Sequence, residues 1–231
     1  MDTSGILLAA GQGRRLGKEE GKAFLLLAGK PLLSWCGQAF AVSGVVEELV
    51  VVVSPGREAQ AEEALADLPL VCKFACGGER RQDSAWAGLS AAGGNWVLIH
   101  DVARPLASAE LIRRVLQSAR LHGAAVPVWP EVDTVRRVAG DFLAPGTVER
   151  AGLVRIQTPQ AFQRGLLVEA YRGAREKGLE LPDDAAAVLA LGRRVATVPG
   201  EPWNLKLTYP EDWEVLRALA KSLPACSRET R

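Results

Sequence analysis

The chain has 231 residues, of which 48% are hydrophobic and 24% are charged, and its formal net charge is +1. This composition excludes the disordered and fibrous classes and suits one α/β domain with a substantial core. The near-neutral charge gives no reason to expect binding to nucleic acid or to an anionic membrane, so any anion site must be local. No apolar run reaches the length of a membrane span, and no basic region precedes a long apolar segment at the start. We therefore expect a cytoplasmic protein.

The first expected element is a short apolar strand, residues 6–9, which runs directly into a loop with Gly11 and Gly13. Four cations follow in the same loop, namely Arg14, Arg15, Lys18 and Lys22. Exposed N–H groups and positive charge after a buried strand favour a polyphosphate site over a merely solvated surface turn. The dinucleotide fingerprint is not met, because Leu16 stands where its third glycine belongs, and no P-loop lysine follows.

Strands and helices then alternate along most of the chain. Strands are expected over residues 48–54, 71–76, 95–99, 124–128 and 195–198, with a further extended piece over 203–208. Helices are expected over residues 31–40, 56–68, 108–121, 164–177 and 183–191, another runs from the glycine pair at 77–78 to about residue 92, and a last one begins at Pro210. This alternation predicts an α/β, Rossmann-like fold with a mostly parallel, twisted sheet flanked by helices.

Polar residues follow two of these strands. Gly77 and Gly78 lead into a helix that carries Ser84, so its first N–H groups could face a ligand, although ordinary helix capping explains them as well. Asp101 and Arg104 come at the end of the strand over residues 95–99, where open α/β sheets bind ligands. Asp101 could hold Mg²⁺ or a substrate hydroxyl, and Arg104 could bind phosphate, but a structural Asp–Arg pair is the alternative.

The alternation stops at residues 131–156, which are expected to form an inserted β-hairpin arm on a single domain of residues 1–231. An arm with few core residues needs a partner surface, and a symmetric homodimer is the common solution. The four cysteines, Cys36, Cys72, Cys76 and Cys226, have no neighbouring histidine, and His100 and His122 lie elsewhere without metal-ligand spacing. Buried or incidental thiols are therefore expected.

Six short motifs occur in a fixed order: Ala9-Ala10-Gly11-x-Gly13-x-Arg15, Lys22, Gly77-Gly78-x-x-Arg81-x-x-Ser84, His100-Asp101-x-Ala103-Arg104-Pro105, Gln157-Thr158-Pro159-Gln160-x-Phe162 and Asn204-x-Lys206-x-Thr208. Together they resemble the 2-C-methyl-D-erythritol 4-phosphate cytidylyltransferase family of the non-mevalonate isoprenoid pathway. The resemblance extends from Ile6 to about Trp213. The glycine loop alone would indicate only the wider group of sugar nucleotidyltransferases. The last two motifs narrow the resemblance to the cytidylyltransferase family.

This resemblance implies a nucleotidyltransferase that moves CMP from CTP to methylerythritol phosphate and releases pyrophosphate, as a Mg²⁺-dependent homodimer. The implied catalytic cations are Arg15, Lys22, Arg150 and Lys206. The implied CTP-binding residues are Ala9, Ala10, Gly11, Gly13, Gly77, Gly78, Arg81 and Ser84. The implied acceptor-binding residues are Asp101, Arg104, Thr134, Arg150, Thr158 and Lys206, with Arg150 reaching the partner subunit's acceptor. The metal would be held by Asp101 or through the CTP phosphates alone.

The implied roles suit the chemistry, since an acceptor phosphate is already a nucleophile and fixed cations can stabilise the growing charge. The chain departs from the family pattern at Gly21, Ala23, Val102, Pro182 and Trp203, which affects the acceptor side more than the reaction class. Two alternatives stay open. One is a cytidylyltransferase for another polyol phosphate such as ribitol phosphate, and the other is a noncatalytic nucleotide-binding module.

Overall fold

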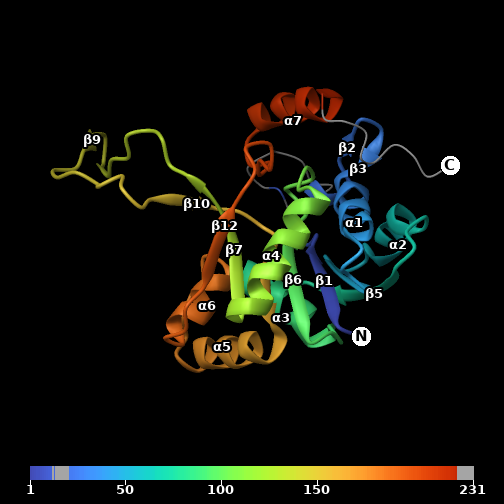
Figure 1. Cartoon of the computed structure of the whole chain (residues 1–231). Helices are drawn as coiled ribbons and strands as arrows, with labels where there is room; N and C mark the ends of the chain where they lie inside the picture. The colour runs from blue at the N-terminus through green and yellow to red at the C-terminus, as the bar shows by residue number, and fades with distance from the viewer. Residues whose placement is uncertain (12, 14–20, 223–231) are drawn as a thin grey trace.

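The structure, a computed structural model, describes residues 1–11, 13 and 21–222 (Figure 1). Its strands are β1 (Thr3–Leu8), β2 (Leu26–Leu27), β3 (Lys30–Pro31), β4 (Glu48–Val53), β5 (Val71–Cys76), β6 (Trp96–Asp101), β7 (Ala124–Pro130), β8 (Val138–Ala139), β9 (Phe142–Leu143), β10 (Val154–Ile156), β11 (Gln160–Gln163) and β12 (Ala196–Pro199). Its helices are the 3-10 turn η2 (Lys22–Phe24), α1 (Leu32–Ser43), α2 (Glu58–Leu65), α3 (Arg81–Ala91), α4 (Ala109–His122), α5 (Arg164–Glu176), α6 (Asp184–Ala190) and α7 (Pro210–Ser222).

The main sheet has eight strands in the order β10-β7-β11-β6-β1-β4-β5, and β12 pairs with β7. Strand β1 lies between β4 and β6 and is parallel to both, and β5 and β12 are parallel to their neighbours as well. In this sheet, β10 and β11 run antiparallel to the strands beside them. The prediction of an α/β fold with a mostly parallel sheet is therefore confirmed.

Helices cover both faces of this sheet, because the apolar side chains of each buried strand alternate between two cores. Leu7 in β1 and Leu98 in β6 pack with apolar residues of α1, α2, α4 and α7. Ile6 and Ile99, their neighbours in sequence, pack on the other face with residues of α3, α5 and α6. Continuous burial on both faces explains why β4 reads as an unbroken run of apolar residues after Glu48.

The parallel strands β1, β4, β5 and β6 end at one edge of the sheet. The first glycine loop follows β1, the glycine pair follows β5, and Asp101 is the last residue of β6. Three of the predicted motifs therefore meet at the edge where open α/β sheets bind their ligands.

The segment predicted as an arm leaves the body between β7 and β10 and extends away from the sheet, with β8 and β9 near its tip (Figure 1). Strands β8 and β9 pair over two residues each, around a turn at Gly140 with a φ of 61°. The last part of the predicted arm, β10, instead joins the main sheet beside β7. The arm is thus a loop with a small hairpin rather than a hairpin along its whole length.

Two segments near the carboxyl end of β6 were not fully described by the sequence. Residues 203–208 have no strand partner in the described structure, and side-chain and backbone contacts from Lys206 and Leu207 hold them instead. Strand β11 was not expected, although it fills the space between β6 and β7 in antiparallel sense. Among the described residues, no helix combines the length and the apolar character that crossing a membrane requires.

Candidate active site

The nucleotide half of the predicted site consists of two loops in close contact. A side-chain carbon at Gly77 would lie 2.3 Å from the Cβ of Ala10, so only glycine allows the loops to approach this closely. The Gly77 N–H donates to the Val53 carbonyl at 2.7 Å, which continues the sheet into the turn. Ser84, which is buried, accepts from the Gly78 N–H at 3.1 Å and so braces the same turn.

The remaining residues assigned to CTP lie around this turn or outside the described residues. Ala9 is buried and donates its N–H to the Val52 carbonyl, and Gly11 is exposed just beyond it. Gly13 has a φ of 64°, which a glycine adopts without strain. Arg15, together with Arg14 and Lys18, lies outside the described residues.

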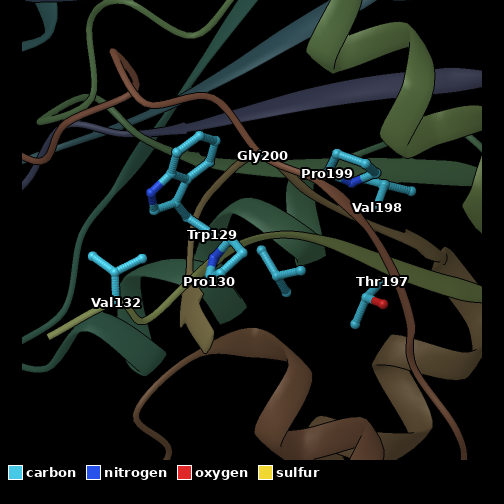
Figure 2. Close-up of a pocket in the computed structure, with 8 residues that line it drawn as sticks. Trp129, Pro130, Val132, Thr197, Val198, Pro199 and Gly200 are labelled. Carbon is cyan, nitrogen blue, oxygen red and sulfur yellow. The ribbon is translucent and has the colours of Figure 1, made fainter. Parts of the chain in front are cut away.

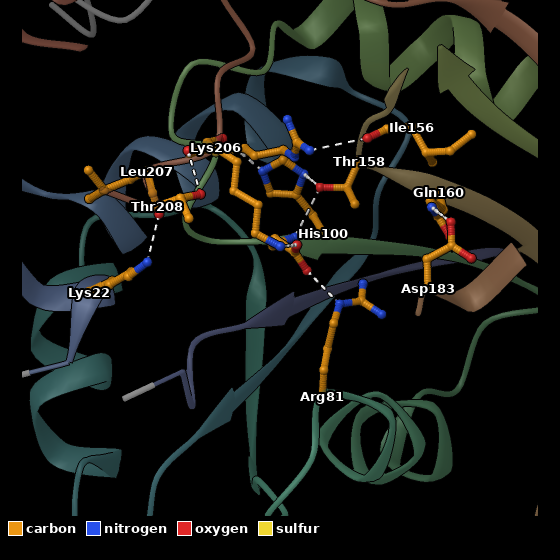
Figure 3. A network of polar contacts seen from close by, with 12 residues as sticks. Lys22, Arg81, His100, Ile156, Thr158, Gln160, Asp183, Lys206, Leu207 and Thr208 are labelled. Carbon is orange, nitrogen blue, oxygen red and sulfur yellow. Dashed lines mark hydrogen bonds and ion pairs between the residues drawn. The ribbon is translucent and has the colours of Figure 1, made fainter. Parts of the chain in front are cut away.

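The acceptor half of the predicted site is organised around the carboxylate of Asp101. Its Oδ1 accepts from Arg81 Nε at 3.0 Å, and its Oδ2 accepts from Lys206 Nζ at 2.6 Å (Figure 3). Burial alone would raise the pKa of Asp101, but Arg81 and Lys206 outweigh it and hold that pKa well below its ordinary value. Asp101 is therefore a fixed anion that orients two cations.

Arg81, which the resemblance assigned to CTP, also belongs to this cluster. Its Nη2 donates to Asp184 Oδ2 at 2.8 Å, and Asp184 Oδ1 accepts from the hydroxyl of Tyr171 at 2.6 Å. Asp184 is fully buried, and α6 and α5 supply it and Tyr171 from the far end of the sequence. Sequence analysis missed both residues, although an aspartate pair before a helix was a visible signal.

Arg104 joins three segments. Its Nη1 donates to the Asn204 carbonyl at 2.8 Å, and its Nη2 donates to the Ile156 carbonyl at 3.2 Å, where the arm returns to the sheet (Figure 3). Its Nε is buried and has no hydrogen-bond partner within the part of the chain that the structure describes. Burial lowers the pKa of Arg104. The structure does not support a structural ion pair between Asp101 and Arg104, because the guanidinium of Arg104 donates to two backbone carbonyls and not to the Asp101 carboxylate.

Lys22 connects the nucleotide half to the acceptor half. Its Nζ donates to the carbonyl of Leu207 at 2.7 Å, and Leu207 directly follows Lys206 (Figure 3). The Leu207 N–H in turn donates to the Ala103 carbonyl at 2.8 Å. The segment that carries Lys206 is thus held between the first loop and the loop after β6.

Two predicted acceptor residues, Thr134 and Arg150, lie on the arm and not in this cluster. Both are exposed, and Arg150 Nη1 donates to the Val132 carbonyl at 2.6 Å. The arm that carries both residues extends away from the body (Figure 1). Thr158, by contrast, is buried beside Asp101. Its Oγ1 accepts a hydrogen bond from the Asp101 backbone N–H at 3.1 Å.

The described residues do not fit a metal held by the protein itself. Both Asp101 oxygens already bind cations, and two neighbouring positive charges disfavour a third. No group of three or more His, Cys, Asp or Glu side chains in residues 1–11, 13 and 21–222 could hold a metal ion. Cys36, Cys72 and Cys76 are free thiols, and Cys226 lies outside the described residues.

A separate apolar pocket of about 470 Å³ lies where β7 passes into the arm (Figure 2). It is lined by Val128, Trp129, Pro130, Val132, Thr197, Val198, Pro199 and Gly200. None of the charged side chains described above is part of this lining, so the pocket is not the polyanion site.

A mostly parallel sheet, a glycine turn and a cation cluster at its carboxyl edge together define a class: α/β enzymes that bind a phosphorylated nucleotide at that edge. The comparisons with known proteins give the family. The model of the family described as IspD, 2-C-methyl-D-erythritol 4-phosphate cytidylyltransferase, matches residues 4–221. The chain therefore belongs to that family, and it is an enzyme of the nucleotidyltransferase class.

Known relatives agree with this membership. The 2-C-methyl-D-erythritol 4-phosphate cytidylyltransferase of Thermus thermophilus is 42% identical over 96% of this chain and 98% of its own. A crystal structure of the enzyme from that organism has a TM-score of 0.80 at 41% identity, covering 96% of this chain and 100% of that one. A bifunctional IspD/IspF enzyme of Anaeromyxobacter dehalogenans is also 42% identical, over 94% of this chain, which spans 57% of that relative.

Proposed function

We propose that this chain transfers CMP from CTP to 2-C-methyl-D-erythritol 4-phosphate and releases pyrophosphate. An oxygen of the acceptor phosphate attacks the α-phosphorus of CTP and forms a new P–O bond. The bond from that phosphorus to the bridging oxygen breaks, and the electron pair leaves on pyrophosphate. No proton transfer is needed, because the attacking phosphate is already an anion.

One observation supports this proposal most: Lys22 Nζ donates to the carbonyl of Leu207, the residue next to Lys206, whose own Nζ donates to Asp101. Two polyanions that must react repel each other, and fixed cations between them lower that cost before the reaction begins. Lys22 and Arg15 are proposed to stabilise charge on the triphosphate. Lys206 and Arg104 are proposed to hold the acceptor phosphate, with Asp101 orienting Lys206.

The turn at Gly77 and Gly78 is proposed to bind the cytidine, together with Ala9, Ala10, Gly11, Gly13 and Ser84. Arg81 is proposed to act from the Asp101 cluster, because its two carboxylate contacts direct it there. The Mg²⁺ is proposed to arrive on the CTP phosphates, where it would neutralise part of their charge.

The chain is further proposed to act as a homodimer, with residues 1–231 as one nucleotidyltransferase domain and the arm of each copy completing the other's acceptor site. The exposure of Thr134 and Arg150 supports this, since both lie on an arm that extends away from its own body (Figure 1). Sedimentation of the purified protein tests the dimer. A cytoplasmic location is proposed as well.

The testing experiment measures pyrophosphate release from CTP and Mg²⁺ with methylerythritol phosphate and ribitol phosphate as parallel acceptors. Release with methylerythritol phosphate alone supports the proposal. Release with ribitol phosphate alone would keep the mechanism and change the acceptor, for which exposed Pro182 before Asp183 is the natural place to look. CTP binding without release from any acceptor would favour a noncatalytic nucleotide-binding module.

A further inference from the structure

His100 is buried at the end of β6, next to the residue that orients the acceptor cations. Its side chain has 0% exposure, and the ring of Phe40 packs against it with centroids 5.6 Å apart. Its two ring nitrogens contact different partners: Nδ1 lies 3.0 Å from Thr158 Oγ1, and Nε2 lies 3.0 Å from the Arg104 carbonyl oxygen (Figure 3). The ring therefore bridges two segments of the acceptor half.

These contacts determine which nitrogen carries the proton. A carbonyl oxygen can only accept, so Nε2 must be the donor to Arg104. Burial lowers the pKa of His100 to about 4, which keeps the ring neutral near pH 7 and leaves Nδ1 bare. A bare Nδ1 accepts, and Thr158 must therefore donate its hydroxyl proton to His100.

The result is a chain of hydrogen bonds with one direction. The Asp101 N–H donates to Thr158 Oγ1, Thr158 donates to His100, and His100 donates to the Arg104 carbonyl. Both ends of this chain are residues of the acceptor site. A second bond, from the Arg104 N–H to the Asp101 carbonyl at 2.9 Å, closes the same turn.

The direction of the chain limits what Thr158 can do. A phosphate oxygen needs a donor, and the single proton of the Thr158 hydroxyl is already used inside the protein. Thr158 therefore supports the acceptor site through the backbone of Asp101, rather than by donating its side-chain hydrogen bond to substrate. The family resemblance had suggested direct binding.

We propose that His100 is a positioning residue for the acceptor half of the site. Through Thr158 and the Arg104 carbonyl it fixes the turn from Asp101 to Arg104, and thereby the carboxylate that orients Lys206 and the guanidinium that meets the acceptor. This inference rests on the proposed function. It assigns His100 no contact with the nucleotide and no proton transfer.

The test combines four single variants with one double variant. His100→Gln keeps a donor within reach of the Arg104 carbonyl and loses the Thr158 contact, whereas His100→Asn does the reverse. Thr158→Val removes the hydroxyl, and Thr158→Ser retains it. Steady-state rates are measured against both substrates, with whichever acceptor the wild-type protein uses, so failure of the proposed function is seen first in the wild-type control.

We expect kcat/KM for the acceptor to fall about ten- to a hundredfold in His100→Gln and Thr158→Val, because small displacements of positioned groups are costly. The KM for CTP should change less than about twofold, and Thr158→Ser should retain most activity. In the double variant His100→Gln with Thr158→Val, the loss should not exceed that of the worse single variant, since both break one bond. Losses that multiply, or equal losses for CTP, would overturn the proposal.

A spectroscopic measurement on the wild-type protein tests the proposal even if the variants do not fold. In wild-type protein labelled with ¹⁵N-histidine, His100 should show a protonated Nε2 and a bare Nδ1 at pH 7, with and without substrates. A proton on Nδ1, in either a neutral or a charged ring, would overturn the proposal, whatever the activity of the enzyme.

Discussion

Two buried carboxylates lie at opposite ends of the strands of one sheet, and only one of them belongs to the proposed site. Glu48, at the start of β4, accepts through Oε1 from Ser4 Oγ and from the Gly93 N–H, each at 2.6 Å, and its Oε2 forms an ion pair with Lys73 Nζ at 2.7 Å. Asp101, at the end of β6, accepts from two cations, Arg81 and Lys206. Burial and a low pKa are common to both, since opposing donors outweigh the effect of burial in each.

The difference is the balance of charge around each carboxylate. At Glu48, where the strand begins, one lysine balances the charge and two neutral donors complete the contacts, so this cluster carries no excess positive charge. At the carboxyl edge, Arg81, Arg104 and Lys206 stand with Asp101 and Asp184, so three cations accompany two carboxylates. The excess positive charge, rather than the buried carboxylate itself, is what distinguishes a polyanion site from a structural clamp.

Neutralising each carboxylate in turn should give the largest difference between the two clusters. Asp101→Asn leaves two cations without their common anion, and we expect it to lower the free energy of unfolding by about 3 to 5 kcal/mol and to abolish most transfer. Glu48→Gln retains a side-chain acceptor for Ser4 or Gly93 and should cost about 1 to 3 kcal/mol. Urea unfolding gives both free energies, and activity is normalised to the folded fraction.

The rate per folded molecule shows whether a carboxylate acts in the reaction or only stabilises the fold. Glu48→Gln should match the wild-type rate per folded molecule, because its cluster contacts neither substrate in the proposed arrangement. If its rate fell as far as that of Asp101→Asn, the two edges would not differ in function and the charge-balance argument would fail.

The lysines provide the next contrast. Lys22→Ala should lower kcat/KM about a hundred- to a thousandfold, and Lys206→Met about a hundredfold, because each removes a fixed charge that is proposed to bind a substrate phosphate. Lys73→Met, beside Glu48, is the control and should leave the rate unchanged. Lys73 and Lys206 are matched in exposure, at 45% and 40%, so loss of a half-exposed lysine is common to both. Equal rates for Lys206→Met and Lys73→Met would contradict this assignment.

The third contrast uses pH and concerns His100 alone. Its pKa is lowered to about 4 in the folded chain, against an ordinary value of about 6.5, so the unfolded chain binds more protons between these values. Stability is therefore complete above about pH 6.5 and declines by about 2 to 3 kcal/mol as the pH falls to 4.5. Urea unfolding at pH 7.5, 5.5 and 4.5 measures this loss.

The variant His100→Asn serves as the reference for that measurement, since asparagine does not titrate. Its free energy of unfolding should lack the part of the pH dependence assigned to His100. Asp101 and Glu48, whose pKa values are lowered in the folded chain, begin to lose stability only below about pH 5, as the unfolded chain takes up protons on its carboxylates, so the measurement at pH 5.5 isolates the part that belongs to His100. A variant with the same pH dependence as wild type would place the lost stability elsewhere.

Local patterns predicted the elements, and tertiary pairing explains what they missed. The strand at residues 71–76 was predicted with the bounds of β5, and Asp101 was correctly placed at a strand end. The partner of Arg81 was not predicted, because Asp184 lies 103 residues further along and meets it only through the packing of α6. Strand β11 escaped notice because only Ala161 and Phe162 interrupt a polar stretch.

The role of His100 was missed for a related reason. A lone histidine in a motif gives no sign of which nitrogen carries a proton, and that depends on Thr158 and on a backbone carbonyl. The family resemblance located the acceptor residues by position, but it could not separate side chains that meet substrate from those that hold others in place.

The smallest expected effect is on stability, and it tests whether the two lysines differ only in function. Lys73→Met and Lys206→Met should each lower the free energy of unfolding by about 1 kcal/mol, since both side chains are partly solvated and each carboxylate keeps other donors. Added salt should reduce both losses, because it screens half-exposed pairs. Unfolding at low and at high ionic strength measures them. A loss for Lys206→Met well above that for Lys73→Met would mean that Lys206 is needed to hold the fold as well as the acceptor, and its effect on activity would then include a structural part.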